Sequence, residues 1–354
     1  MSKLLMNGLL YAKNSVNALH NTYNEWTFGL KLMSQKRKQY YYRVILLSTT
    51  GLTTGLYFTY NTLFINQYKA VVHSYKSGRL SQLDKDLELF AANVWTECQQ
   101  SVDKSPESLQ FFPSVGCDPL TIGTLGLPSG AVIGLPFPLT YRTVDDVKTV
   151  DLRFKGEHNP YMKWRSAAGK AFIESLVLSE RAKKFAIARP IHMANNVNLF
   201  LDCLNISVAT IVAIGLAQEI IARVKALQTF GQRFVVRSLS LIVAYYLWST
   251  LNQSINYYAT LRADKRAISV GEDYYVGAIE YYTKMKTRNA AFNELTEDNG
   301  WKVFTEEGEI KGLISSRLLT INSLLYSSKH LKSDLKRDVS EEVASTSYKP
   351  HSSF

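Results

Sequence analysis

The chain has 354 residues, of which 41 are Lys or Arg and 30 are Asp or Glu, so its formal net charge is +11. A basic balance favours nucleic acid as a partner, but the charge is spread along the chain and no zinc-finger or RNA-recognition pattern occurs. The cysteines Cys98, Cys117 and Cys203 lack C-x-x-C spacing, which argues against a thiolate zinc site and a disulfide scaffold. A Cys98–Cys117 disulfide remains an alternative to two free thiols if this part of the chain faces an oxidising compartment.

The N-terminal segment, residues 1–43, is basic and contains no acidic residue before Glu25. Its lysines and arginines are interspersed with leucine, serine and asparagine. This composition is typical of a mitochondrial targeting region, and a basic juxtamembrane tail is the alternative. We therefore interpret residues 1–43 as a basic targeting or matrix segment.

Three apolar stretches predict membrane-spanning helices. The first belongs to an uncharged run, Val44–Tyr68, which exceeds the roughly 20 residues that cross a hydrocarbon core; we assign this span to residues 44–66. The second and third, at 199–221 and 235–257, are joined by a basic turn and form a predicted membrane hairpin. The alternative for 199–221 is a buried helix of a soluble domain, which would leave two spans.

The positive-inside rule sets the expected orientation of these spans. Basic clusters precede the first span and separate the second from the third, which places the N-terminus and the hairpin tip on the same side of the membrane. A soluble head, built from residues 67–198 and 258–331, then lies on the opposite side. Asp202 and Glu219 lie near the ends of the second span, and they are either functional charges or simple span ends.

The first half of the head shows both helix and strand patterns. The amphipathic stretch Leu83–Val94 predicts a helix. Pro128, Ser129 and Gly130 predict a turn into a strand of sequence AVIGLPF, and Val150–Phe154 predicts another strand. The glycines of this region do not form a phosphate-binding loop, because no Lys-Ser or Lys-Thr pair follows them and prolines interrupt the place where a helix would start.

One long amphipathic helix is expected between the head strands and the membrane hairpin. Its sequence, WRSAAGKAFIESLVLSERAKKFAIAR, covers Trp164–Arg189 and repeats small apolar residues at steps of three and four. Ser166 is the expected N-cap, and Pro190 is expected to end the helix. Glu180 and Lys184 are spaced for an ion pair one turn apart.

The C-terminal part begins with another predicted helix. Its apolar face is formed by Tyr275, Ala278, Ile279, Tyr282, Met285 and Phe292. Turns at Asn299-Gly300 and Glu307-Gly308 then predict a small β-hairpin, and residues 314–328 resume a helical pattern. The tail at 332–354 is charged, rich in serine and predicted to be disordered.

Three blocks of sequence are distinctive, namely LPSGAVIGLP at 127–136, the long helix at 164–189, and GAIEYYTKMKTRNAAF with NGWKVFTEEGEI at 277–310. In this order they resemble the transmembrane protein 177 family. The resemblance covers roughly residues 40–330. It implies a multi-pass protein of the mitochondrial inner membrane, and in that membrane the orientation expected from the basic clusters places the head in the intermembrane space. It also implies a role in biogenesis of cytochrome c oxidase subunit 2, through the membrane chaperone that holds this newly inserted subunit.

The order of parts also resembles membrane zinc peptidases, in which a strand, an H-E-x-x-H helix, a membrane hairpin and a glutamate-bearing helix follow one another. When KFAIARPIHM is aligned with the metal-binding helix, Arg189 replaces the first histidine, Pro190 the glutamate and Met193 the second histidine. His192 is one position away and has no histidine four residues before or after it. A cation at a ligand position would repel Zn²⁺. The likeness is therefore either coincidence or a scaffold that has lost its metal, and both readings predict no peptidase activity.

Together these patterns predict a mainly α membrane protein with about three transmembrane helices and a small α+β soluble head that contains a short β-sheet. The expected function is non-enzymatic, namely binding and stabilising partners during cytochrome c oxidase assembly. A membrane metallopeptidase-like protein and a scaffold of unrelated purpose are the alternatives. We assign no catalytic, cofactor-binding or metal-binding residue, no nucleic acid and no small-molecule substrate. The expected segments are 1–43, 44–66, 67–198, 199–221, 235–257, 258–331 and 332–354.

Overall fold

The structure is a computed structural model, and it describes residues 34–76, 79–102, 108–148, 163–195, 197–224, 229–296, 304–309 and 313–324. These residues are mainly helical, with small β-sheets, as the sequence predicts. The chain divides into two compact units. The three-helix unit comprises Met1–Asn61 and Asn198–Asn256, and the α+β unit comprises Thr62–Val197 and Tyr257–Phe354.

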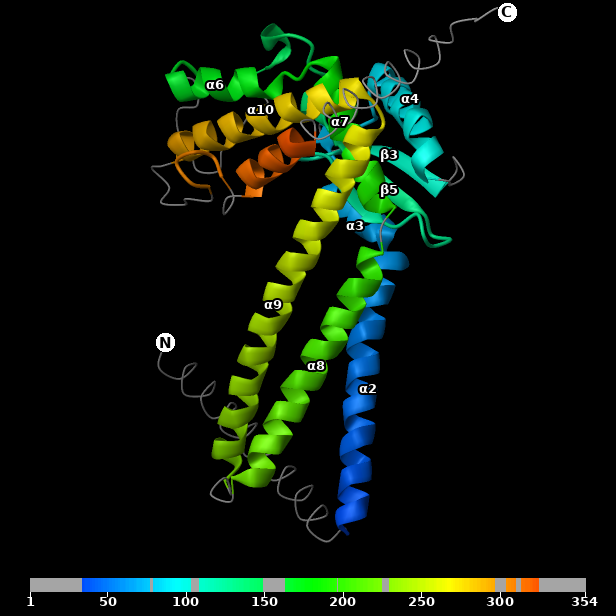
Figure 1. The fold of residues 1–354 in the computed structure, drawn as a ribbon, viewed down its shortest axis with the longest axis vertical. Helices are drawn as coiled ribbons and strands as arrows, with labels where there is room; N and C mark the ends of the chain where they lie inside the picture. The colour runs from blue at the N-terminus through cyan, green and yellow to red at the C-terminus, as the bar shows by residue number, and fades with distance from the viewer. Residues whose placement is uncertain are drawn as a thin grey trace, which may run out of the picture. The chain divides into compact units, whose positions relative to one another are not determined.

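The three-helix unit consists of α2 (Gln35–Thr62), α8 (Asn198–Arg223) and most of α9 (Phe230–Ser269), which lie side by side in Figure 1. Among the described residues, α8 and α9 are the two helices long and apolar enough to cross a membrane. Only 22% of the most apolar window of α8 and 11% of that of α9 is buried. Most of each window is therefore uncovered, which favours 199–221 as a span over a buried helix of a soluble domain.

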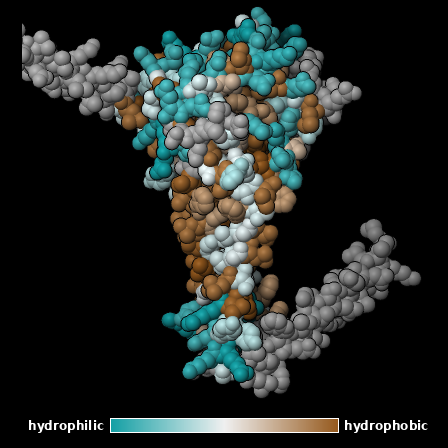
Figure 2. All heavy atoms as spheres, turned by 90° about the vertical axis from the view of Figure 1, so that its right-hand side faces the viewer, coloured by the Kyte–Doolittle hydropathy of each residue, from teal (hydrophilic) through white to brown (hydrophobic). Residues whose placement is uncertain are grey.

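The helix boundaries refine the three predicted spans. The helix that contains the first span ends at Thr62, before the expected end at residue 66, and a separate helix α3 (Ile65–Val72) follows. The third span lies within α9, which continues well beyond residue 257 into the α+β unit. In Figure 2 hydrophobic side chains gather along the three-helix unit, and hydrophilic ones gather at the end where α8 leads to α9. This is the pattern that a membrane helix bundle presents to lipid and water.

The α+β unit contains a three-stranded sheet in the order β3-β5-β4. The central strand β5 (Ala131–Pro136) is parallel to β3 (Leu109–Ser114) and antiparallel to β4 (Leu120–Gly123). All six residues of β5 are buried, which explains its continuous apolar sequence. The predicted turn before β5 is confirmed, and its Gly130 has a φ of +68° that favours glycine. The strand expected at 150–154 lies outside the described residues.

The core of the α+β unit is built around α7 (Glu180–Ala194). This helix packs against α10 (Glu272–Thr296), α4 (Lys85–Val102) and the strands β4 and β5. A further helix over 313–324 adds Ile314 and Ile321 to the same apolar cluster. Elsewhere β1 (Tyr75–Lys76) and β2 (Arg79–Leu80) pair in antiparallel fashion.

The long helix predicted at Trp164–Arg189 is wrong as a single element. It is two helices, α6 (Ala167–Leu176) and α7, separated at Val177–Ser179. Ser166 caps α6 as expected by accepting a hydrogen bond from the amide of Gly169, and Ser179 caps α7 by accepting one from the amide of Ala182. The two helices share one apolar periodicity, so the break between them is not visible in the spacing.

Two further expectations about this region are wrong. Pro190 does not end the helix, because α7 continues through it to Ala194. The carbonyl of Pro190 accepts a hydrogen bond from the Thr121 hydroxyl of β4 at 3.1 Å. Lys184 forms its ion pair with Glu97 of α4 at 2.9 Å, although the helical spacing predicted Glu180 as the partner. Contacts with the rest of the core decide both features.

The C-terminal helix predicted from Tyr275 onwards is confirmed as α10, although its buried face is rotated from the expected one. Tyr274, Gly277 and Tyr281 are buried, while Tyr275 and Ile279 are only partly buried. The β-hairpin expected near 299–310 falls partly outside the described residues. Its described part, 304–309, forms a turn in which the amide of Gly308 donates to the carbonyl of Thr305 at 2.8 Å. The tail beyond residue 331 lies outside the described residues.

Candidate functional site

A buried charge cluster occupies the centre of the α+β unit. Asp264 of α9 is fully buried, and its carboxylate lies 3.1 Å from Nε of Arg189 on α7. The Tyr282 hydroxyl of α10 donates to the other carboxylate oxygen at 2.8 Å, and Nε of Arg317 lies 4.0 Å from that oxygen. We call these four residues the Arg189 cluster. It joins four elements through one carboxylate, and its two guanidinium groups leave it with a net positive charge.

The Arg189 cluster lies where the likeness to zinc peptidases would put a metal. Arg189 is at the first ligand position of the aligned helix, and a buried guanidinium takes the space and the acidic partner that a cation would use. Pro190 and Met193 offer no replacement donor pair. In the part of the chain that the structure describes, no three His, Cys, Asp or Glu residues lie close enough to hold a metal ion. These residues therefore do not fit zinc.

His192, the histidine nearest to that motif, is 1% exposed and neither ring nitrogen has a hydrogen-bond partner. Burial and the neighbouring charge of Arg266 lower its pKa to about 4. The imidazole is therefore neutral at physiological pH and packs as a core side chain.

A second polar cluster links α4 to α7 and α10 at the surface of the α+β unit. Glu97 accepts hydrogen bonds from Lys184 at 2.9 Å and from the Tyr274 hydroxyl at 2.7 Å. Burial raises the pKa of Glu97, but these two hydrogen bonds outweigh it and lower the pKa below its ordinary value. The arrangement holds three helices together and leaves the carboxylate ionised.

Hydroxyl groups form a seam between α2 and α8 in the three-helix unit. The Thr54 and Ser207 oxygens are 2.7 Å apart, and those of Thr53 and Thr210 are 3.3 Å apart. Thr53 and Thr54 are consecutive on α2, and Ser207 and Thr210 lie three residues apart on α8. Hydrogen bonds of this kind join helices in a bilayer, where the apolar surroundings give no competing water.

The two acidic residues singled out in the sequence differ in their surroundings. Asp202 belongs to α8 and accepts a hydrogen bond from the Tyr57 hydroxyl of α2 at 3.4 Å, so it extends the hydroxyl seam. Glu219 is exposed and pairs with Arg223 one turn further along α8. Asp202 therefore has a structural partner on another helix, whereas Glu219 marks the end of the apolar stretch.

The three cysteines are free thiols in the structure. Cys98 is buried in α4, and its burial raises the pKa of the thiol to about 12. Cys117 is half-buried. A Cys98–Cys117 disulfide is not formed, and a buried thiol with a raised pKa is poorly reactive.

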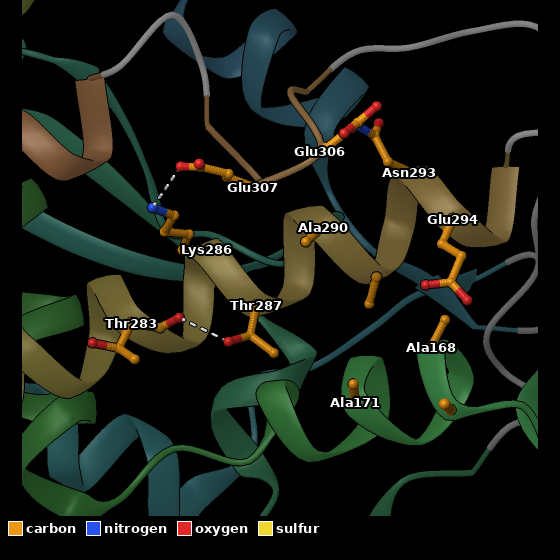
Figure 3. A pocket seen from close by; sticks show the side chains of 12 residues that line it. Ala168, Ala171, Thr283, Lys286, Thr287, Ala290, Asn293, Glu294, Glu306 and Glu307 are labelled. Carbon is orange, nitrogen blue, oxygen red and sulfur yellow. Dashed lines mark hydrogen bonds and ion pairs between the residues drawn. The ribbon is translucent and has the colours of Figure 1, made fainter.

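A groove runs between α6, α10 and the turn at 304–309, and it has a volume of about 750 Å³. Figure 3 shows Ala168 and Ala171 on the α6 side, Thr287 and Ala290 on α10, and Glu306 on the turn. We call it the α6–α10 groove. Its walls carry small side chains and its rim carries carboxylates, so it offers a surface for binding.

Sequence reasoning missed the partners of Arg189 and most of the groove. Asp264 and Arg317 lie 75 and more residues from Arg189 along the chain, and no spacing rule connects them. The signal that could have found Asp264 is a single acidic residue on an otherwise apolar helix face between Ala259, Ala263 and Ala267, all of which are buried. Acids in such positions need a cationic partner.

These features define a class of protein, a helical membrane protein that carries a folded α+β unit. The sequence model of the family described as Transmembrane protein 177 matches residues 92–342, well over half of the chain. The chain belongs to this family. The match continues past Lys332 to residue 342, which corrects the expectation that the resemblance ends near residue 330.

Individual relatives agree with the family assignment. The chain is 28% identical to Transmembrane protein 177 of Danio rerio over 270 residues, which cover 74% of this chain and 83% of that protein. It is 26% identical to Transmembrane protein 177 of Homo sapiens over 226 residues, which cover 62% and 68% of the two chains. The protein of that name from Xenopus laevis is 24% identical over 281 residues. No solved structure matches this chain.

Proposed function

We propose that this chain is a non-enzymatic protein of the mitochondrial inner membrane that binds and stabilises partners while cytochrome c oxidase is assembled. The expected partners are newly inserted oxidase subunit 2 and the membrane chaperone that holds it. The proposal rests on the resemblance to the transmembrane protein 177 family for the identity of the partners, and on the basic, acid-poor residues 1–43 for the organelle.

The observation that carries a binding function is the uncovered apolar surface of α8 and α9. Exposed side chains on α9 include Leu239, Ile242 and Tyr246, which lie three and four residues apart along one face. A bilayer covers such a face, and so does the transmembrane helix of another protein. A factor that accompanies a newly inserted membrane subunit needs a surface of this kind.

We further propose that α2 is a third span, so that the α+β unit lies in the intermembrane space and the N-terminus in the matrix. The hydroxyl seam supports this proposal, because the polar residues that make α2 less apolar than α8 include Thr53, Thr54 and Tyr57, which have partners on α8. A helix whose polar groups are satisfied by a neighbour is tolerated in a membrane.

The test of the function is capture of newly made mitochondrial proteins. We would tag the C-terminus, label mitochondrial translation products briefly, solubilise the membranes gently and isolate the tagged protein. Oxidase subunit 2 is expected to be enriched over the other translation products. A second inner-membrane protein with the same tag and similar abundance is the control.

The assembly role would be contradicted if all translation products were enriched equally. It would also be contradicted if no translation product were enriched while the tagged protein is intact. Replacing Leu239, Ile242 and Tyr246 together by alanine should reduce the enrichment if this face of α9 makes the contact. The matched control replaces Leu47, Leu52 and Leu56, which are exposed on α2, outside the proposed surface.

A further inference from the structure

The floor of the α6–α10 groove is a strip along one face of α10. Thr283, Thr287, Ala290 and Glu294 lie at steps of four, three and four, so they share that face, and all four line the groove. The eleven residue steps from Thr283 to Glu294 extend about 16 Å along the helix at 1.5 Å per step. The strip is thus as long as three turns of a second helix laid against it.

The threonine hydroxyls of the floor are satisfied within α10 itself. The Thr283 hydroxyl donates to the carbonyl of Ile279, and the Thr287 hydroxyl donates to the carbonyl of Thr283, each at about one turn's distance. These protons are therefore used within α10. Ala168 and Ala171 of α6 form one wall, and such small side chains let the backbone of a docked helix approach closely.

The other wall is an acidic turn that α10 holds in place. The Asn289 amide donates to the carbonyl of Gly308 at 3.1 Å, and the Asn293 amide donates to the carbonyl of Thr305 at 3.0 Å. Gly308 has a φ of +76°, and a Cβ there would lie 2.0 Å from the carbonyl oxygen of Lys286. The turn therefore packs directly on the α10 backbone, and its side chains at 306 and 307 project from a fixed base.

Carboxylates dominate the rim of the groove. Glu294 comes from α10, and Glu306 and Glu307 come from the turn; all three are exposed. The single lysine of the lining, Lys286, is engaged by Glu307 at 3.5 Å and by Glu309 at 3.2 Å. The rim is thus acidic on a chain whose net charge is +11, so its charge does not follow the average of the protein.

We propose that the α6–α10 groove binds an amphipathic helix of a partner protein, with Ala or other small apolar residues against the floor and Lys or Arg along the acidic rim. Helix-in-groove recognition matches the length of the strip, its small side chains and its charge. This inference rests on the proposed function only in taking the partner to be a protein. It adds a binding surface outside the three-helix unit and the chemistry of the segment that binds there.

The test is peptide binding to the full-length protein in detergent micelles. The probe is a fluorescein-labelled helical peptide of 14 residues with one Ala/Leu face flanked by lysines, and the comparison peptide has glutamate in place of each lysine. We expect the lysine peptide to bind at least tenfold more tightly, and its affinity to fall as salt is raised. Equal affinity for the two peptides would overturn the proposal.

Variants place the binding in the groove. The double variant E306K/E307K should lose the lysine peptide and gain the glutamate peptide, a reversal that loss of folding cannot give. E88K/E174K changes the net charge equally at exposed positions of α4 and α6 outside the groove, and it should leave binding unchanged. T287W should weaken the binding of either peptide, because the tryptophan side chain fills the floor of the groove. Unchanged binding in both E306K/E307K and T287W would refute the site.

The two proposals fail separately. If the peptide preference is absent while oxidase subunit 2 is still captured by the tagged protein, the groove inference is wrong and the proposed function stands. If the peptide binds in the groove while no translation product is captured, the proposed function is wrong and the groove inference stands.

Discussion

At the scale of single residues, Asp264 is the most consequential side chain in the α+β unit. Its buried carboxylate is shared by Arg189, Arg317 and the Tyr282 hydroxyl. The substitution Asp264→Asn keeps the shape but leaves two guanidinium groups without their anion. We expect a loss of about 3–5 kcal/mol in the free energy of unfolding, which is typical when one partner of a buried ion pair is removed. Denaturant titration of the detergent-solubilised protein measures it.

The control for Asp264→Asn is Asp86→Ala, which breaks the ion pair with Arg142 at the surface. Both side chains of that pair are more than 70% exposed. Exposed pairs contribute roughly 0–1 kcal/mol, so this variant should unfold nearly as the native protein does. A similar loss in the two variants would mean that burial of the Arg189 cluster does not determine how much Asp264 contributes to the free energy of unfolding.

His192 makes the stability of the α+β unit depend on pH. Its folded-state pKa of about 4 lies below the ordinary value of 6.5. Between these two pH values the unfolded chain binds a proton at His192 that the folded chain does not bind. Stability therefore falls as pH drops through this window, by about 2 kcal/mol between pH 7 and pH 5. Melting temperatures at the two pH values measure the effect.

His192→Phe provides the matched comparison, because phenylalanine keeps a planar ring and removes the titrating nitrogens. The variant should lose much of the difference between pH 7 and pH 5. Glu97 and Glu309 have pKa values that are lowered in the fold, so their protonation also makes the folded protein less stable, but at a lower pH than that of His192. An unchanged difference in the variant would show that His192 is not the group responsible.

At the scale of elements, α7 and α10 cross in close contact at Gly277. A Cβ on Gly277 would lie 2.0 Å from the carbonyl oxygen of Arg181. Gly277→Ala must push the two helices apart, and we expect a loss of about 1–3 kcal/mol or more in the free energy of unfolding. The control is Gly271→Ala, where the new methyl group would meet Tyr274 at an ordinary 3.8 Å.

Much of this architecture could be predicted from the periodicity of apolar residues. The elements that the sequence analysis missed share one physical cause, namely that they depend on contacts between distant segments. The helices around Leu83–Val94, the two hairpin spans and α10 were predicted because their apolar spacing is local. The break between α6 and α7 was missed, because both helices bury a face against α10 and so keep one common period. Strands β3 and β4 were missed as well; their pairing with β5 is a contact between separate segments.

The same limit applies to the candidate sites. Ser166 was recognised as a cap because a cap is local. The Arg189 cluster and the α6–α10 groove each combine at least three elements that are distant in sequence. Lys184 illustrates the competition: a neighbour at helical spacing, Glu180, was available, but Glu97 on α4 is the partner in the fold.

The hydroxyl seam predicts a measurable coupling between α2 and α8. In a double-mutant cycle with Thr54→Val and Ser207→Ala, the two hydroxyl groups 2.7 Å apart should show an interaction free energy of about 0.6 kcal/mol, the average for hydrogen bonds between membrane helices. Unfolding by titration with sodium dodecyl sulfate measures each variant. Thr54→Val combined with Ser254→Ala on α9 is the control, and that pair should be additive.

At the scale of the whole molecule, the packing of the α+β unit constrains how the chain crosses the membrane. Helices α7 and α10 pack together in this unit, yet α8 and α9 lie between them in sequence. The two helices must therefore lie on the same side of the membrane, so the proposal that α8 crosses it requires that α9 cross back. A single crossing in this region is incompatible with the fold, and what remains to be tested is whether α2 adds a third span.

Labelling of introduced cysteines decides this question. In a variant whose native cysteines are replaced by alanine, we would place single cysteines at the exposed residues Gln39, Gln82 and Thr229 and treat mitochondria with ruptured outer membranes with an impermeant maleimide. With three spans, position 82 is labelled, while 39 and 229 are labelled only after detergent opens the inner membrane.

If α2 does not cross, positions 39 and 82 must behave alike, because no span separates them. Position 229 at the hairpin tip then serves as an internal reference, since it lies across the membrane from position 82 in either topology. The experiment separates two and three spans by the behaviour of position 39 alone. Protection of that position would give α2 a transmembrane role that its hydropathy does not indicate, with the hydroxyl seam as its physical basis.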